Sequence, residues 1–250
     1  MNLASHLMLT CIFCDDVHAP LRQDIGQSWP TYVADALGAE ASVIAWSGIG
    51  CLWNAPHTDG GPMLEKYDQL VGSDREAGLI GTAAEHGSAN GGQASDRRAC
   101  TVGMVVFYLG GNDWWTLQKH PSKELDFVAG MSRMLRQTRE LRPLPTPIVV
   151  LVPGSECTVS CTPKPAEQVK FSETMRRVHA AAVEAAGGEA HGITVAEVTP
   201  EPRIELGLES DWGGMLHWSA QAQRKWAAGV IPHVRSVLGA LGQDELQLRA

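Results

Sequence analysis

One apolar run constrains the fold of this 250-residue chain more than any other segment. Residues 102–109 read Val-Gly-Met-Val-Val-Phe-Tyr-Leu, and Gly110-Gly111-Asn112-Asp113 follow directly. A short apolar run rich in β-branched residues is typical of a strand buried on both faces, as in a parallel sheet. The glycines allow a sharp turn and place Asn112 at the edge where open α/β sheets bind ligands. An Asn amide there can donate to a developing oxyanion, although these residues alone favour an ordinary turn.

Strands and helices alternate along the rest of the chain. The apolar runs predict further strands at residues 7–13, 41–46, 148–152 and 193–198. Helices are expected from Ser28 to a stop at Gly38, around 63–71, over 122–141, over 166–186, and from Ser219 onward. Repeated strand–helix units predict a mostly parallel sheet of about five strands with helices on both faces, which is a three-layer α/β/α sandwich.

The spacing of apolar residues predicts which face of each long helix is buried. We expect the helix at 122–141 to bury Leu125, Val128, Met131 and Leu135, and the helix at 166–186 to bury Phe171, Met175, Val178 and Ala182. In the last helix the expected buried residues are Trp226, Val230, Val234 and Leu238. Pro232 is expected to kink or interrupt that helix.

Length and composition indicate one folded domain over residues 1–250, with residues 1–27 atypical or truncated and residues 72–100 a flexible loop insertion. The net charge of −8 argues against nucleic acid or an anionic membrane as the main partner. No apolar run reaches the ~20 residues of a membrane span. The first residues make a weak signal peptide, so the compartment stays open. The sequence does not indicate the oligomeric state.

Six cysteines lie at positions 11, 14, 51, 100, 157 and 161. An even number suits disulfides in a secreted protein, and the pairs 11/14 and 157/161 leave a zinc-stabilised fold as a weaker possibility. The expectation for the functional site is that it contains no metal.

Three loops that the predicted topology brings to one sheet edge carry the chemistry. They are Ser47-Gly48-Ile49-Gly50, Gly110–Asp113, and the stretch from Asp211 to Ser219 that contains His217. A glycine N–H, an Asn amide and a His are what acyl transfer requires beside a nucleophile. Each loop alone fits an ordinary turn, so the interpretation depends on their joint occurrence in this order.

With these blocks the chain resembles the SGNH (GDSL-like) hydrolases, and within them the acetyl esterases of carbohydrate esterase family two. The similar segments are residues 28–40, 43–50, 62–67, Leu109–Asp113 and His217-Trp218-Ser219. The resemblance implies a flavodoxin-like sheet and hydrolysis of O-acyl esters, O-acetyl above all, on a small-molecule or glycan substrate. It also implies that no cofactor takes part.

By that resemblance Gly48 N–H and the Asn112 side chain form an oxyanion hole, and His217 is the general base that activates a serine. Asp211 is the candidate for orienting His217. It lies six positions upstream of the histidine, whereas the superfamily usually has its Asp three upstream, and position 214 here is Gly. In some acetyl esterases of the narrower group a backbone carbonyl is thought to orient the histidine instead.

The nucleophile block departs from the family. No Gly-Asp-Ser occurs in the chain. In one register, residues 7–13 are the first strand and Cys14-Asp15-Asp16 places Asp16 at the nucleophile position; in the other, which the clean match from Ser28 favours, the first block is absent. Ser47, Cys11 and Cys14 are weaker candidates. The alternative function is therefore an inactive pseudo-esterase that binds glycan or protein through the retained cleft.

Tryptophans gather around the three loops. The chain has 8 Trp against 3 Tyr and 4 Phe. Indole rings suit the flat apolar faces of sugar rings, so part of this set is expected to line a substrate cleft and the rest to cover the sheet edge. The candidates for substrate binding are Trp46, Trp114, Trp115, Trp212 and Trp218, whereas Trp29 and Trp226 are expected in the core.

Overall fold

The structure of the chain is a computed structural model. It describes residues 6–11, 25–45, 48–67, 102–142, 144–154, 165–200, 202, 204, 211–214 and 217–247. The predicted loop at 72–100 and four of the six cysteines (Cys14, Cys100, Cys157 and Cys161) lie outside the described residues.

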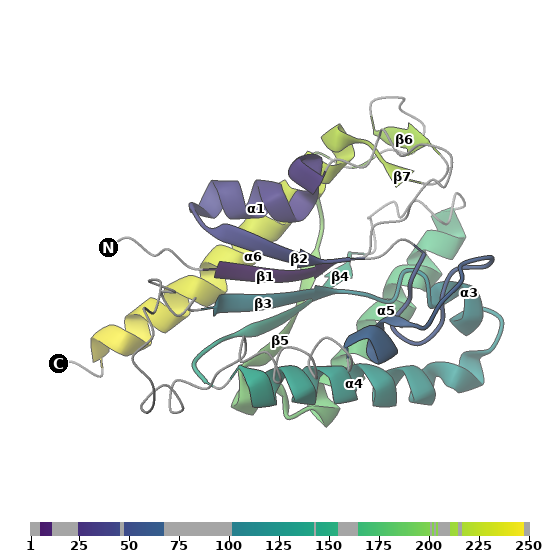
Figure 1. The fold of residues 1–250 in the computed structure, drawn as a ribbon, viewed down its shortest axis with the longest axis horizontal. Helices are drawn as coiled ribbons and strands as arrows, with labels where there is room; N and C mark the ends of the chain where they lie inside the picture. Colours follow the sequence, from purple (N-terminus) through teal and green to yellow (C-terminus); the bar gives the residue numbers. More distant parts are fainter. Residues whose placement is uncertain are drawn as a thin grey trace, which may run out of the picture.

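Five parallel strands form the central sheet (Figure 1). They are β1 (His6–Cys11), β2 (Glu40–Ile44), β3 (Val102–Tyr108), β4 (Ile148–Pro153) and β5 (Ile193–Val198). The strand order is β2-β1-β3-β4-β5, the flavodoxin-like order. The strands that the sequence predicts are all present, with boundaries that differ by at most two residues. The predicted fold class is thus confirmed.

Helices cover both faces of this sheet (Figure 1). They are α1 (Trp29–Leu37), α4 (Glu124–Leu141), α5 (Pro165–Ala185) and α6 (Ala220–Gln247), together with the short α3 (Trp114–Leu117) and a helical turn at residues 63–67. Side chains of β3 alternate between the two faces, as a strand requires. Val105 and Phe107 pack in the cluster with α4 and α5, whereas Met104 and Val106 pack in the cluster with α1 and α6.

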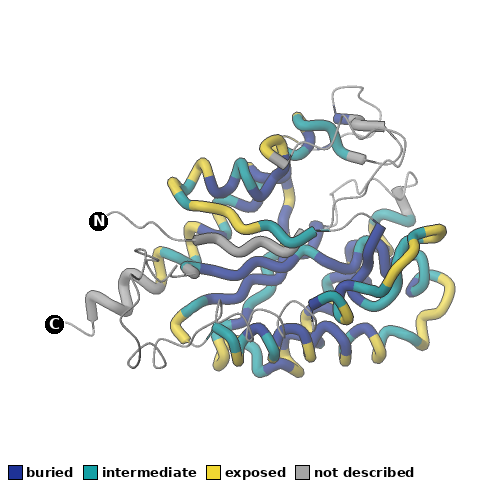
Figure 2. The backbone as a smooth tube through the Cα atoms, viewed as in Figure 1, coloured by how far each residue is buried: buried dark blue, intermediate teal, exposed yellow. Residues whose placement is uncertain are grey.

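Burial along β3 and β4 explains their composition. Every residue of β4 is buried, whereas the first three residues of the edge strand β2 are exposed (Figure 2). A strand covered on both faces needs apolar side chains at every position, and the run Ile-Val-Val-Leu-Val meets that requirement. The most regular apolar runs of the sequence therefore mark the centre of the sheet.

The ends of α1 follow from its sequence. Pro30 lies in the first turn, where a missing N–H leaves no helical hydrogen bond unmade. Gly38 ends the helix in the left-handed region at φ 63°, and its N–H lies against the carbonyl groups of Ala34 and Asp35. Both predicted boundaries of this helix are confirmed.

The expected buried face of α4 is wrong at one residue. Leu125 is 79% exposed, whereas Phe127, Met131, Met134 and Leu135 are fully buried. Leu125 lies two positions before Phe127, which places it about 200° around the helix from the buried stripe. The stripe is set by Phe127 and continues at spacings of three and four, so Leu125 faces solvent in the first turn.

Pro232 does not interrupt α6, which is continuous from Ala220 to Gln247. The proline removes one N–H, so the carbonyl group four residues earlier, at Ala228, loses its helical partner. Both residues lie on the exposed side of the helix, where water can solvate that carbonyl. The expected core residues Trp226, Val230 and Val234 of the same helix are fully buried. None of the helices among the described residues combines the length and apolar composition needed to cross a membrane.

The register aligns the carboxyl ends of the central strands. Cys11 of β1 pairs with Tyr108 of β3, and Thr10 pairs with Ile44 of β2. From β1 the chain crosses to β2 on one side and from β2 to β3 on the other, so the sheet has its switch point between β1 and β3. The hairpin of β6 (Trp212–Gly214) and β7 (His217–Trp218) lies at this same end of the sheet (Figure 1).

Candidate active site

The turn between β3 and α3 begins with a glycine of positive φ. Gly110 has φ 101°, a conformation that L side chains rarely adopt. A Cβ at this position would lie 2.9 Å from Met175 Sδ, 3.0 Å from His179 Cε1 and 3.3 Å from Phe127 Cζ. The next residue, Gly111, has nothing within 4 Å of such a Cβ. The sharp turn thus depends on Gly110, and not on the Gly-Gly pair as a unit.

Asn112 follows this turn and is buried, with 4% of its surface exposed. Its Nδ2 donates to the carbonyl oxygen of Ile49 at 3.1 Å. An amide nitrogen carries two N–H donors, and the one aimed at Ile49 fixes the orientation of the group. Ile49 directly follows Gly48, so two of the predicted site residues are brought together by this contact.

Gly48 lies buried at the start of the loop after β2, with φ 65°. A Cβ there would collide with the side chain of Thr58, so this position excludes other residues on both conformational and steric grounds. Its carbonyl oxygen accepts the N–H of Ala55 at 2.7 Å. The approach of its N–H to a ligand stays a prediction.

Asp113 is a fully buried carboxyl group that the sequence analysis treats only as part of a turn. Its Oδ2 accepts the N–H of Cys51 at 2.7 Å, and its Oδ1 accepts those of Leu52 at 2.8 Å and Trp53 at 2.9 Å. Burial raises the pKa of Asp113 to about 6, because the three backbone hydrogen bonds lower it only in part. The carboxylate joins two loops that lie about sixty residues apart in sequence.

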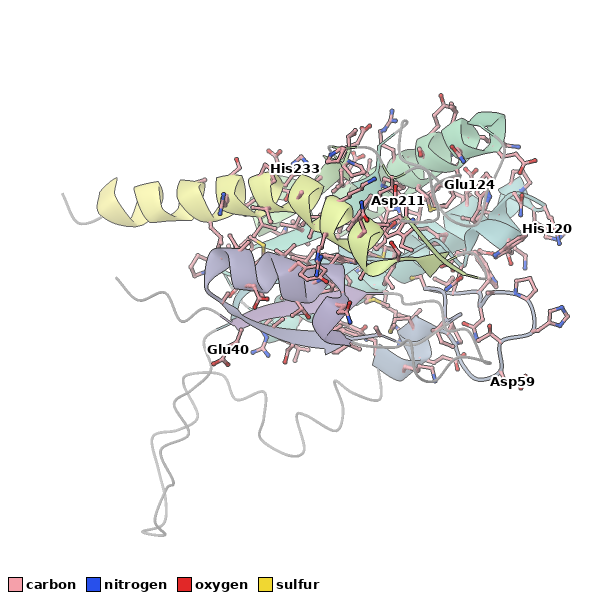
Figure 3. The ribbon with its side chains drawn as sticks, turned by 90° about the horizontal axis from the view of Figure 1, so that it is seen from above. Glu40, Asp59, His120, Glu124, Asp211 and His233 are labelled. Carbon is pink, nitrogen blue, oxygen red and sulfur yellow. The ribbon has the colours of Figure 1, made fainter. Side chains whose placement is uncertain are left out.

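Asp211 forms an ion pair that the sequence analysis does not predict. Its Oδ2 lies 2.6 Å from Nζ of Lys225 on α6, and the carboxyl side chain is fully buried. Figure 3 shows Asp211 beside the first turns of α6. The carbonyl oxygen of Asp211 accepts the N–H of Ser219 at 3.1 Å. Asp211 is thus bonded to α6 through its side chain and to the residue just before α6 through its backbone, and a role in orienting His217 stays a prediction.

His217 is the first residue of β7, and its Cα pairs with that of Gly214 across the hairpin. The following residue, Trp218, anchors the hairpin. Its ring lies 5.1 Å from the ring of Trp226 on α6, and it packs against both apolar clusters. The backbone of the predicted general base is therefore attached to the core at its neighbour.

The tryptophans divide between core and surface. Trp114 is only 2% exposed and its ring lies 5.4 Å from that of Phe171 in a T-shaped arrangement, so its predicted place in a substrate cleft is corrected to the core. At this exposure the ring has almost no surface that a ligand could contact. Trp115 and Trp218 are half-buried. Trp46 lies outside the described residues, and of Trp212 the structure gives the backbone, in β6.

Two further tryptophans were predicted as core residues, and Trp29 and Trp226 are indeed fully buried. Trp53 is half-buried and packs against the apolar cluster on the α4 and α5 face. Lys123 Nζ lies 5.1 Å from the centre of its ring, a cation–π contact. Trp53 and Trp115 are thus the half-buried indoles that belong to the loops around Asn112.

The predicted nucleophile position follows β1. Residues 6–11 form the central strand, paired with both β2 and β3, which agrees with the first of the two registers as far as the strand is concerned. The sequence analysis favours the register in which this block is absent, and the choice between the two registers stays a prediction. Asp16 and the residues around it lie outside the described part of the chain.

Two buried titratable groups, His179 and Cys51, lie near residues 110–113. His179 on α5 is buried, and its Nδ1 donates to the carbonyl oxygen of Met175 at 2.7 Å. Burial lowers the pKa of His179 to about 4, so the ring is neutral at pH 7. Burial, and next the charge of Asp113, raise the pKa of the Cys51 thiol well above its ordinary value. Among the described residues, no three His, Cys, Asp or Glu side chains are grouped so that they could hold a metal ion.

No family model and no curated protein sequence matches this chain. Solved structures of esterases do. A carbohydrate esterase family 2 enzyme with a carbohydrate-binding domain, from Corynascus thermopiles (Myceliophthora fergusii), superimposes with a TM-score of 0.61 and 20% identity, covering 94% of this chain and 67% of that one. A family two carbohydrate esterase from Clostridium thermocellum, in complex with cellohexaose, superimposes with a TM-score of 0.62 and 17% identity. The match covers 94% of this chain and 65% of that one.

A carbohydrate acetylesterase from Sinorhizobium meliloti gives a TM-score of 0.54 and 13% identity, covering 93% of this chain and all of that one. The chain thus spans about two thirds of the length of the two family-two enzymes and matches the third over its full length. At these identities the similarity shows a shared α/β fold and nothing finer.

Proposed function

We propose that this chain is an SGNH-type esterase that hydrolyses O-acyl, and above all O-acetyl, esters of carbohydrates. The observation that carries the proposal is the buried Asn112 amide beside the Gly48-Ile49 backbone, at the switch point of a parallel sheet. In this proposal the Gly48 N–H and Asn112 Nδ2 stabilise the oxyanion of the tetrahedral intermediate. The similarity to carbohydrate acetyl esterases supports the choice of substrate class.

His217 is the proposed general base, which takes the proton of the nucleophile and returns it to the leaving alcohol. The anchoring of Trp218 on α6 supports this role, because a general base must be held within hydrogen-bond reach of its partner. The nucleophile is the part of the mechanism that the chain does not supply in the family's Gly-Asp-Ser form. Asp211 completes the proposed set as an orienting group, with Trp115, Trp212, Trp218 and Trp46 near the substrate.

Hydrolysis of 4-nitrophenyl acetate and acetate release from acetylated xylo-oligosaccharides test this function. We expect Asn112→Ala to lower kcat by about 10²–10³-fold, the loss measured for one oxyanion donor. His217→Ala should lower it at least as far. Because exposed imidazole groups attack activated esters on their own, His120→Ala, a change at an exposed histidine, is the matched control. Equal rates in all three variants and the unaltered chain would refute an esterase site.

A second function, glycan binding without catalysis, is favoured by one observation, the absence of Gly-Asp-Ser. It predicts that xylo- or cello-oligosaccharides bind in a calorimetric titration while no acetate is released. Ester hydrolysis that depends on His217 would count against it.

A further inference from the structure

Two consecutive residues of the turn after β3 contact the same loop. Asn112 donates to the carbonyl oxygen of Ile49, and the Asp113 carboxylate accepts hydrogen bonds from the three N–H groups of residues 51–53. Four hydrogen bonds thus join two residues of the turn to residues 49–53, which we call the clamped loop. Both side chains that make them are buried.

The clamped loop transmits this attachment to Gly48 through hydrogen bonds of its own. Gly48 O accepts from Ala55 N at 2.7 Å, and Gly50 N donates to Asn54 Oδ1 at 3.2 Å. The Asn54 amide also donates to Gly60 O at 2.8 Å. Because the segment is internally bonded on both sides of residues 51–53, displacing those residues also displaces Gly48.

We propose that Asp113 is a positioning residue whose carboxylate fixes the clamped loop against the turn and thereby sets the spacing between the Gly48 N–H and the Asn112 amide. This inference rests on the proposed function, in which those two groups bind the oxyanion. Asp113 itself does not touch the substrate, since its oxygens are committed to backbone groups.

The chemistry of the contact requires a carboxylate. Three N–H donors converge on two oxygens, and an ionised carboxyl group is the side chain that only accepts. An Asn side chain in its place would present an NH₂ group to at least one of these donors. Gly50 supports the same view, because a Cβ there would lie 2.7 Å from Asp113 Oδ2 and would collide with the Trp53 carbonyl. The backbone passes too close to the carboxylate for any other residue.

The test is Asp113→Asn, with Asp59→Asn as the matched control. Asp59 is exposed and lies a few residues further along the same stretch of chain, and Figure 3 shows it at the periphery. We expect Asp113→Asn to lower kcat for 4-nitrophenyl acetate by about 10–100-fold with KM within about twofold, since a misplaced catalytic group reduces the rate by about 10²-fold. Asp59→Asn should leave both constants unchanged.

Hydrogen exchange supplies a readout that does not depend on activity. In Asp113→Asn we expect the amides of Cys51, Leu52 and Trp53 to lose at least about tenfold in protection, while those of Val105 and Val106 in β3 keep theirs. A merely stabilising role would lower protection everywhere or nowhere, and either result overturns the inference. If the unaltered chain hydrolyses no ester, the proposed function fails, and the exchange result still decides whether Asp113 holds the loop.

If Asp113→Asn does not fold, the unaltered chain gives the same test at two pH values. Asp113 takes up a proton below about pH 6, whereas the adjacent Cys51 thiol stays neutral throughout. Because the closed loop binds this proton more tightly than the solvated carboxyl group of an opened loop does, the protection factors of the three amides should then rise selectively between pH 7.5 and pH 5. Unchanged protection would overturn the inference.

Discussion

Two fully buried aspartates, one after β3 and one at the start of the β6–β7 hairpin, are stabilised in different ways. Asp113 accepts three backbone N–H groups from residues 51–53, whereas Asp211 pairs with one cationic side chain, Lys225. In the first arrangement, three neutral N–H dipoles of one loop replace the hydration that the buried carboxylate has lost. In the second, the charge of Lys225 on α6, 14 positions further along the chain, stabilises the buried carboxylate.

The difference determines which substitutions disturb each site. Backbone donors cannot be removed by changing a side chain, so the Asp113 contact can be broken only at Asp113 or by moving the loop. The Asp211 contact can be broken from either side, and removal of Lys225 leaves a buried carboxylate without its cation. The Asp113 contact therefore does not depend on which side chains residues 51–53 carry, whereas the ion pair of Asp211 requires a cationic side chain at position 225.

The largest effect is expected from breaking the ion pair. Lys225→Met should lower the free energy of unfolding by about 3–5 kcal/mol, because the buried Asp211 carboxylate loses the cation of this ion pair. Urea unfolding followed by fluorescence measures this, with the exposed Lys119→Met as the control. The double variant Asp211→Leu/Lys225→Met should recover most of the loss; a single variant that loses less than about 1 kcal/mol would show that the pair is not effectively buried.

A smaller effect is expected from His179, which lies behind the turn on the Asp113 side. Its pKa in the folded protein, about 4, is below its ordinary value of 6.5, so the unfolded chain takes up a proton first as the pH falls. This contribution to stability is present above pH 6.5 and is lost as the pH falls through 4, by about 3 kcal/mol at most.

Asp113 acts in the opposite direction. Its pKa of about 6 is above its ordinary value, so its contribution favours folding at low pH and is lost as the pH rises through 6. The two groups therefore partly cancel between pH 4 and 6. We expect His179→Leu to gain stability relative to the unaltered chain on going from pH 7 to pH 4, as measured by urea unfolding. The exposed His191→Leu should show no such gain.

The smallest of the three effects concerns the backbone of the same turn. Gly110→Ala should cost about 2 kcal/mol, because the residue has φ 101° and a Cβ would crowd Met175 and His179. Gly111→Ala is the adjacent control, with nothing within 4 Å of its Cβ and an expected change within about 0.5 kcal/mol. Thermal unfolding compares the two. Equal losses would mean that the turn tolerates no side chain at either position, contrary to its geometry.

Periodicity in the sequence was sufficient for most of the fold. The runs at 102–108 and 148–153 are buried strands, Gly38 ends α1, and the spacing of Phe171, Met175, Val178 and Ala182 marks the buried face of α5. These features are local, since a strand or helix repeats every two or 3.6 residues. Where two registers of the same period competed, as at Leu125, the pattern alone did not choose between them.

The candidate site was predicted only in part, because the sequence pattern reports local structure and not contacts between distant segments. Gly48 and Asn112 are recognisable as residues that follow strands, and the parallel sheet brings them together. Asp113 and Lys225 were missed as partners, because nothing in the residues around them shows that a loop sixty positions earlier or an aspartate 14 positions earlier lies within 3 Å. Trp114 was misassigned to a cleft because burial depends on what packs against it, here Phe171.

The sequence by itself thus determined the elements, the edge of the sheet where chemistry belongs, and the types of residue gathered there. Only the tertiary structure decided how the two buried carboxylates are compensated and which tryptophans are core residues. The physical reason is that backbone conformation follows from neighbours along the chain, whereas burial and electrostatic compensation follow from neighbours in space. The sequence is enough to recognise Asn112 as a candidate oxyanion donor. The hydrogen bonds of Asp113 to the clamped loop can be recognised only in the tertiary structure.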